Sequence, residues 1–202
     1  MKSGTKSVLT VVGVILVIVF MIYRFFAGNY NTMVSLDESV KTQWAQVQNQ
    51  YQRRMDLIPN LVNTVKGYAK HESEVFTQIA DARSKAGGVV NIDSSVLEDE
   101  EQFAKYQKVQ NELGASLQRL LAITENYPEL KADSNFLALQ DQLEGTENRI
   151  TTERKRYNEI VSAYNQFIRR FPQSFVANMN GFKAKAYFTA SEEAQTAPTV
   201  EF

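Results

Sequence analysis

The first feature of the chain is an uninterrupted apolar run close to its N-terminus. Residues 8–22 read VLTVVGVILVIVFMI, a stretch without charge in which only a threonine and a glycine are not apolar. Residues 23–26, YRFF, add an arginine that can snorkel and aromatic rings suited to a membrane interface. The usable span is then about 18–20 residues, which matches the thickness of a bilayer core. The pattern predicts a single transmembrane helix over residues 8–26, after a short tail over residues 1–7.

A cleaved signal peptide is the alternative interpretation of this run, because Lys2 and Lys6 make a plausible basic leader region. Cleavage is disfavoured, since the one small-residue candidate site, after Phe26, has Arg24 at position −3 and a bulky side chain at −1. We therefore expect an uncleaved anchor. The two lysines before the span, against Arg24 alone just beyond it, place the N-terminus in the cytoplasm and the large domain outside it by the positive-inside rule.

From Val40 onward, apolar residues recur at steps of three and four, which is the period of an amphipathic α-helix. They are Val40, Trp44, Val47, Tyr51, Met55, Ile58, Val62, Val65, Ala69, Phe76 and Ile79. The stripe predicts a first long helix that keeps its phase across Pro59, where we expect a kink and not a break. The sequence SLDE at 35–38 is a capping-box pattern that could start this helix afresh, which would leave residues 27–35 as a joint. Alternatively, the membrane helix runs straight on.

Two further long helices are predicted after this one. The glycine pair and the Asn/Asp content of residues 86–93 indicate a loop, and Ser95 with Glu98 forms a second capping-box pattern, opening a helix that ends near Asn126. Asp133 is placed to cap the third helix. The apolar stripes are Phe103, Tyr106, Val109, Leu113, Leu117, Leu120 and Ile123, and then Phe136, Leu139, Leu143, Ile150, Tyr157, Val161, Tyr164 and Ile168.

A shorter helix is expected from Gln173 to Met179, ended by Gly181, and the small polar residues of 189–202 predict a flexible tail. The predicted fold class is therefore all-α: an N-terminal single transmembrane helix followed by an up-down-up bundle of three long helices plus a short C-terminal helix. The bundle domain would occupy residues 36–188.

Composition narrows the chemistry that this domain can perform. Lys+Arg 22 nearly balance Asp+Glu 23, so the chain lacks the basic excess that nucleic-acid binding requires. The absence of cysteine excludes disulfides and a thiolate nucleophile, and the single histidine, His71, excludes a metal site built on two histidines. No cofactor is predicted.

Two charged residues interrupt the apolar stripe of the third helix. Glu147 and Arg154 lie one heptad apart on a face that is otherwise apolar. Such a pair could belong to an active site. We favour a polar layer that fixes the register of the helices, or a bundle end that solvent enters, because no catalytic constellation accompanies the pair.

Several motifs in this chain resemble those of the LemA family. They are YQRRMDLIPNLV at 51–62, VKGYAKHE at 65–72, ENYPELK at 125–131, ENRI at 147–150, the Tyr-Asn pairs at 157–158 and 164–165, and FP at 171–172. Together they span nearly the whole soluble chain, in the family's order and spacing. The resemblance implies a bacterial, single-pass membrane protein with a helical domain, and it supplies no settled activity.

Many of these motif residues are polar, which packing alone would not require. The candidate polar network consists of Arg53, Arg54, Asp56, Asn60, Glu125, Glu147, Asn148, Arg154, Tyr157 and Asn158. We hypothesise that the members on the first helix, from Arg53 to Asp56, meet Glu147 and Arg154 of the third in an interhelical network of ion pairs and amides.

The expected function is that of a non-enzymatic, membrane-anchored scaffold in the cell envelope, with the lipid bilayer as one partner. Self-association is expected because three amphipathic helices cannot bury their apolar stripes well unless neighbouring copies cover them. An unidentified envelope protein is a further candidate partner. The alternatives are a metal or hydrolytic enzyme built on carboxylates at the bundle end, and a sensor domain that binds a peptide or a lipid. The expected location is the bacterial inner membrane, with the C-terminal domain outside the cytoplasm.

Overall fold

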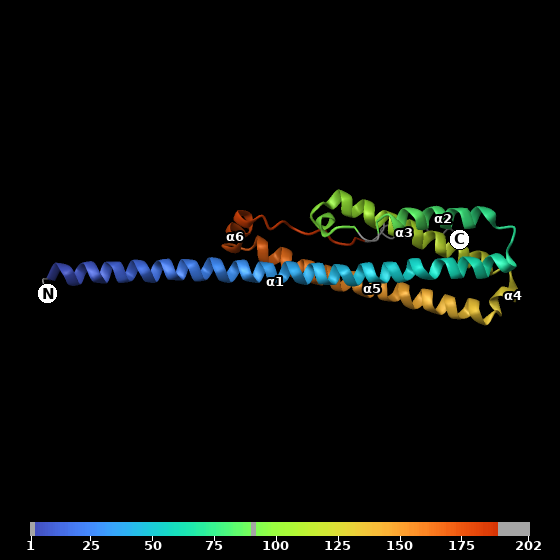
Figure 1. The fold of residues 1–202 in the computed structure, drawn as a ribbon, viewed down its shortest axis with the longest axis horizontal. Helices are drawn as coiled ribbons and strands as arrows, with labels where there is room; N and C mark the ends of the chain where they lie inside the picture. The colour runs from blue at the N-terminus through green and yellow to red at the C-terminus, as the bar shows by residue number, and fades with distance from the viewer. Residues whose placement is uncertain (1–2, 90–91, 190–202) are drawn as a thin grey trace, which may run out of the picture. The chain divides into compact units, whose positions relative to one another are not determined.

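The computed structural model describes residues 3–89 and 92–189, with side chains from Val8 onward. Every regular element in that part of the chain is helical (Figure 1). The elements are α1 (Ser3–Tyr68), α2 (Ser73–Gly87), a 3-10 helix η1 (Ser94–Glu98), α3 (Glu100–Thr124), α4 (Pro128–Lys131), α5 (Ser134–Arg169) and α6 (Gln173–Asn180). The predicted all-α class, with one N-terminal helix able to span a membrane, is confirmed.

Contacts within the chain group its residues into two compact units. The anchor unit holds the residues up to Ser39 together with Ser162–Ala184. Among the described residues, the bundle unit holds Val40–Val161 without residues 90 and 91, together with residues 185–189. Helices α1 and α5 each contribute residues to both units.

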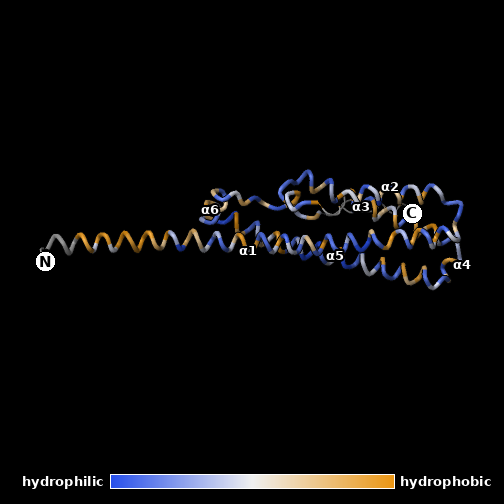
Figure 2. Tube along the Cα trace, in the orientation of Figure 1, coloured by the Kyte–Doolittle hydropathy of each residue, from blue (hydrophilic) through white to orange (hydrophobic). Residues whose placement is uncertain are grey.

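The apolar N-terminal part of α1 has the properties of a membrane span. Its large side chains from Val8 to Tyr23 are exposed, and the helix is long and apolar enough to cross a bilayer (Figure 2). Residues 27–35, which we expected to form a joint, are helical throughout. The side chains of Asn29 and Thr32 bond back to carbonyls four residues earlier, at 2.8 and 2.9 Å, an arrangement compatible with an uninterrupted helix. The helix that carries the apolar run therefore continues without a break as far as Tyr68.

Helix α1 passes through Pro59 without a break but ends at Tyr68, earlier than the stripe suggested. The chain turns over residues 69–72, and α2 runs back antiparallel to α1 (Figure 1). Phe76 and Ile79 are buried as predicted, but they belong to α2. The expectation of one helix reaching Ile79 was wrong because a short turn that preserves the phase of the stripe leaves the same apolar spacing as a continuous helix.

Apart from the short helices η1 and α4, the described part of the bundle unit consequently contains four long helical segments where we predicted three. They come from α1, α2, α3 and α5, and successive segments alternate in direction (Figure 1). Up-down-up-down is therefore the correct description of this unit. Its centre is rich in aromatic side chains, with ring centroids 4.9 to 6.4 Å apart. The contributing residues are Trp44, Tyr51, Phe103, Tyr106, Tyr157 and Phe188.

The caps of the later helices differ in part from the predicted ones. Asp133 caps α5 as expected, accepting from the backbone N–H groups of Asn135 and Phe136 at 2.9 and 2.8 Å. The predicted capping box at Ser95 does not start α3. Asp93 caps the 3-10 helix instead, and Asp99 then accepts from two backbone N–H groups at the start of α3. The interruption lets Val96 and Leu97 turn into the core, where both are buried.

The short C-terminal helix is present as predicted. Helix α6 ends at Asn180 and is capped by Gly181, whose φ of 75° lies in the left-handed region. Residues 185–189 belong to the bundle unit, where the Ala186 N–H donates to the Leu97 carbonyl at 2.8 Å and Lys185 pairs with Glu98 at 2.8 Å. The flexible tail was predicted over residues 189–202. Thr189 is hydrogen-bonded to the Gln107 side chain of α3 and so belongs to the bundle unit, and residues 190–202 lie outside the described residues.

Candidate functional site

The best defined polar arrangement in the bundle unit is centred on Arg54. This side chain lies on the buried face of α1 and is only 3% exposed. Its Nη1 donates to Glu147 Oε1 of α5 at 3.1 Å, and its Nη2 donates to the backbone carbonyl and to Oε1 of Gln110 of α3, at 3.1 and 2.7 Å. One guanidinium thus joins three helices, because its fork of N–H donors can address several acceptors at fixed angles.

A cavity of about 490 Å³ opens beside this group. It lies between α1, α3, α5 and the residues that follow α6 in the bundle unit, 185–189, which we call the C-terminal segment. Its lining residues are Tyr51, Arg54, Gln110, Asn111, Gly114, Ala115, Gln118, Glu147, Ile150, Thr151, Arg154, Lys155, Asn158, Phe188 and Thr189. Three of these side chains are cationic and one is anionic. Because the single carboxylate is paired with Arg54, the cavity carries an excess of positive charge.

Three residues of the cavity lining carry a buried donor that has no hydrogen-bond partner among the described residues: Arg54 Nε, Gln110 Nε2 and the Tyr51 hydroxyl. The Tyr106 hydroxyl, on a ring that lies 5.9 Å from that of Tyr51 and outside the lining, also has no partner among them. Burial raises the pKa of Tyr51, although the nearby guanidiniums of Arg154 and Arg54 oppose the effect, and burial raises the pKa of Tyr106 as well. Both hydroxyls therefore stay protonated and can donate. A buried donor without an acceptor is costly, so the cavity is chemically suited to a ligand rich in acceptor oxygens.

The C-terminal segment forms one wall of the cavity. The Arg154 guanidinium carbon lies 4.5 Å from the centroid of the Phe188 ring, a cation–π geometry. The Asn158 carboxamide makes two hydrogen bonds to the backbone of Phe188, and Tyr157 donates to the Ala186 carbonyl at 3.1 Å. These contacts attach residues 186–188 to α5 and hold the wall in place.

The structure brings together some members of the predicted network and leaves others apart. Arg54 and Glu147 are in direct contact, and Arg154 and Asn158 line the same cavity, with Tyr157 buried behind it. The remaining members are exposed and do not line the cavity: Arg53, Asp56, Asn60, Glu125 and Asn148. The helical period explains the division, because Arg53 and Asp56 point away from the face that carries Tyr51 and Arg54.

Gln110 and Phe188 are among the cavity residues that the predicted network did not include. Gln110 occupies a core phase of α3, between Tyr106 and Leu113, and a polar residue at an apolar position was the signal that could have identified it. Phe188 gave no comparable signal. Its place beside Arg154 depends on the path of the chain after α6, which local periodicity does not contain.

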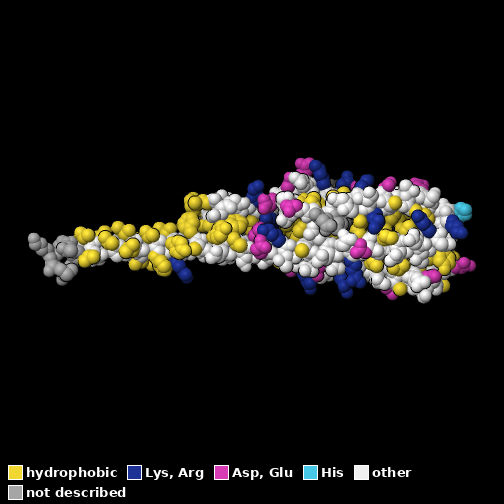
Figure 3. Space-filling model, in the orientation of Figure 1, with side chains coloured by type: hydrophobic (Ala, Val, Ile, Leu, Met, Phe, Trp, Pro, Cys, Tyr) yellow, Lys and Arg dark blue, Asp and Glu magenta, His cyan; other side chains and the backbone are white. Residues whose placement is uncertain are grey.

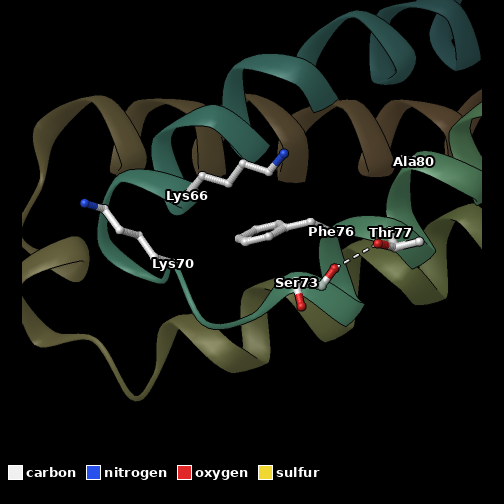
Figure 4. A pocket seen from close by; sticks show the side chains of 6 residues that line it. All are labelled: Lys66, Lys70, Ser73, Phe76, Thr77 and Ala80. Carbon is white, nitrogen blue, oxygen red and sulfur yellow. Dashed lines mark hydrogen bonds between the residues drawn. The ribbon is translucent and has the colours of Figure 1, made fainter.

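A second cavity, of about 530 Å³, lies where α1 meets α2 (Figure 4). Its lining comprises Lys66, Lys70, Ser73, Phe76, Thr77 and Ala80, and the Lys66 ammonium lies 5.2 Å from the centroid of the Phe76 ring. Both lysines are exposed, and none of the buried polar atoms that lack a partner belongs to a residue of this lining. The cavity beside Arg54 therefore has the more specific binding chemistry.

The next feature is the placement of the Asp, Glu and His side chains that could bind a metal ion. Within residues 3–89 and 92–189, no three or more Asp, Glu or His side chains gather closely enough to hold a metal ion. In the cavity beside Arg54, the only carboxylate belongs to Glu147, which already accepts from a guanidinium. Such a site favours anionic groups over divalent cations.

Comparison with known proteins assigns a family context to these features. The LemA family pattern matches residues 43–202. Magnetosome protein MamQ 2 of Paramagnetospirillum magneticum is 28% identical over 203 residues, which cover 92% of this chain and 73% of that protein. Magnetosome protein MamQ of Magnetospirillum gryphiswaldense is 25% identical, over 93% of this chain and 74% of that protein. Protein LemA of Metamycoplasma hominis is 24% identical, over 84% and 73%.

Proposed function

The chain belongs to the LemA family, and on that premise we propose that it is a non-enzymatic assembly module of the bacterial cell envelope. Its anchor would hold the bundle unit at the membrane, and the cavity beside Arg54 would receive an acidic segment of a partner protein. The observation that carries this proposal is the set of buried, unpartnered donors beside an excess of cationic side chains. Carboxylate groups of a peptide are acceptors that match both features.

Binding is favoured over catalysis by the state of the groups in the cavity. A hydrolytic site needs a base that can activate water, or a nucleophile with such a base beside it. Here Glu147 is occupied by Arg54, and burial keeps the nearby tyrosine hydroxyls protonated. The names of the magnetosome relatives associate those proteins with a cellular structure and not with a reaction, which also favours an assembly role.

We propose further that copies of the chain associate through the membrane. The premise of an incomplete three-helix bundle no longer applies, because α2 supplies a fourth segment and the apolar stripes are buried inside the bundle unit. The longest exposed apolar surface of the described chain is the N-terminal part of α1, so helix–helix contact in the bilayer is the route that we propose.

The test is the mass of the intact particle, purified in mild detergent from native membranes. We expect a particle heavier than one copy that contains a second protein. The variant Arg154→Gln/Lys155→Gln should stay folded but should no longer purify together with the second protein. The matched control is Lys108→Gln/Arg156→Gln, which removes the same charge from exposed positions outside the cavity lining and should retain it.

Each result of this experiment decides part of the proposal. A monodisperse single copy of the wild type with nothing attached would overturn the assembly role. A particle made only of copies of this chain would support self-association and contradict the acidic partner. Loss of the second protein in both double variants would show that the cavity is not its binding site.

The proposed location is the inner membrane, with the N-terminus in the cytoplasm and the bundle unit outside. Because the chain has no cysteine, a single introduced thiol can report the side on which it lies. We expect Lys108→Cys, on an exposed face of α3, to react with a membrane-impermeant maleimide in intact spheroplasts. Reaction only after the membrane is permeabilised would reverse the orientation.

A further inference from the structure

Helix α6 packs against α1 immediately beyond the predicted membrane span. The Phe175 ring lies edge-on to Phe26, with centroids 6.2 Å apart, and the Phe182 ring lies 5.8 Å from Tyr30. Phe26 is the last residue of the span, so these contacts place α6 at the level of the bilayer edge. Figure 3 shows hydrophobic side chains on α6 next to those of α1.

The outer side of this segment is strongly apolar. Phe175 and Met179 lie four residues apart, on one face of α6, and are 59% and 65% exposed. Phe171, just before the helix, is 89% exposed. The inner face is already occupied, since Val176 and Ala177 are buried. Large side chains gathered in this way on a water-facing surface are uncommon and mark an interaction site.

The charges of the same segment have one sign. From Ser162 to Ala184 the chain contains three cationic residues, Arg169, Arg170 and Lys183, and no acidic residue. All three are exposed. Apolar side chains beside cationic ones, at the end of a membrane span, are what an interfacial segment presents to acyl chains and to phosphate headgroups.

We propose that α6 is a membrane-surface helix: Phe171, Phe175 and Met179 enter the interface of the bilayer that α1 spans, and the flanking arginines meet anionic lipid headgroups. The occupant is the lipid and not a second protein, because the Phe26–Phe175 contact fixes α6 at the depth where the lipid must be. Attachment to α1 also keeps the helix beside the bilayer at high effective concentration. This inference is independent of what the cavity beside Arg54 binds.

The absence of cysteine allows a direct measurement of depth. Met179→Cys in the full chain, labelled with an environment-sensitive fluorophore, would be reconstituted into vesicles of phosphatidylcholine and phosphatidylglycerol that carry nitroxide lipids. Phe20→Cys, inside the span, is the positive control. Ser35→Cys is the negative control: it is exposed on α1, nine residues after Phe26, which is about 14 Å further along the helix.

The label at residue 179 should be quenched nearly as strongly as the label at 20, and several-fold more than the label at 35. Quenching no greater than at residue 35 would overturn the proposal, and a blue-shifted but unquenched label would indicate a protein contact instead. In vesicles without phosphatidylglycerol, or in Arg169→Gln/Arg170→Gln, we expect weaker quenching. Unchanged quenching in both would contradict the headgroup contact.

Discussion

Asn158 makes a paired hydrogen bond with the backbone of Phe188, thirty residues further along the chain. Its Nδ2 donates to the Phe188 carbonyl at 2.8 Å, and the Phe188 N–H donates to its Oδ1 at 2.9 Å. An asparagine side chain is the group that offers a donor and an acceptor in the geometry of a peptide. The Asn158 side chain therefore pairs with both backbone polar groups of Phe188, as the peptide groups of a neighbouring β-strand would. This pairing holds the Phe188 ring among the core aromatics.

Replacing this carboxamide by a carboxylate should release the segment. Asn158→Asp removes the donor and directs a charged oxygen at the Phe188 carbonyl, so we expect a loss of about 2 kcal/mol of unfolding free energy. Trp44 is the only tryptophan, and its ring centroid lies 6.1 Å from that of Phe188, so the native emission should also shift to the red. Denaturant titration followed by fluorescence measures both effects. Asn148→Asp, at an exposed position of the same helix, is the control and should change little.

The Arg54–Glu147 pair should be coupled, but unequally. Arg54→Ala leaves the carboxamide oxygen of Gln110 without its guanidinium donor, removes a further bond to the Gln110 carbonyl, and should cost about 2–4 kcal/mol of unfolding free energy. Glu147→Ala should cost less, because the Glu147 side chain is 41% exposed. A double-mutant cycle should give a coupling of about 1 kcal/mol. Arg53→Ala, at the exposed neighbouring position, is the control; a loss there equal to that of Arg54→Ala would contradict the assignment.

Exchanging the two charges should not restore stability, even though the pair exists. In Arg54→Glu/Glu147→Arg, the new carboxylate at position 54 would face the Gln110 carbonyl, which now accepts from the guanidinium at 3.1 Å. Two acceptors would then meet in a buried place. The double-mutant cycle with alanine at both positions, measured by chemical denaturation, is consequently the informative experiment.

Acid should weaken the caps of α3 and α5. Hydrogen bonds from backbone N–H groups, led by that of Gln102 for Asp99 and that of Phe136 for Asp133, hold the pKa of each carboxyl below its usual value. Each cap therefore contributes its stability fully above the unfolded-state pKa of about 3.9, and loses it as the pH falls through the lower folded-state pKa. Asp99→Asn retains a capping side chain without a titrating group, so melting temperatures between neutral pH and pH ~2 should fall less steeply for this variant than for the wild type.

Two glycines should respond to alanine in opposite directions. Gly181 has a φ of 75°, which an L-residue reaches only with strain, so Gly181→Ala should destabilise by about 1 kcal/mol although the new methyl group meets no atom within 4 Å. Gly145 lies inside α5, also with open space around it, and Gly145→Ala should stabilise by roughly 0.5–1 kcal/mol. Thermal unfolding of both variants gives the comparison, and two shifts of the same sign would contradict the backbone argument.

Much of the local structure could be predicted because it depends on neighbouring residues. The apolar run at 8–22, extended by the interfacial residues 23–26, has the length of a bilayer core. The cap at Asp133 depends on backbone groups two and three residues away. The division at residues 69–72 could not be predicted in this way. A turn of suitable length keeps Val65, Phe76 and Ile79 on one apparent stripe, while the chain reverses direction between them.

The sequence by itself determined the helical class, the anchor, the apolar faces and the polar residues that packing does not require. Only the tertiary structure decided that Arg54 reaches Glu147 and Gln110. It also decided that Phe188 closes the cavity and that Phe175 meets Phe26. The physical reason is that helix period reports which side of its own helix a residue occupies. Which helix lies opposite depends on turns and loops, whose conformation is set by contacts between residues far apart in the chain.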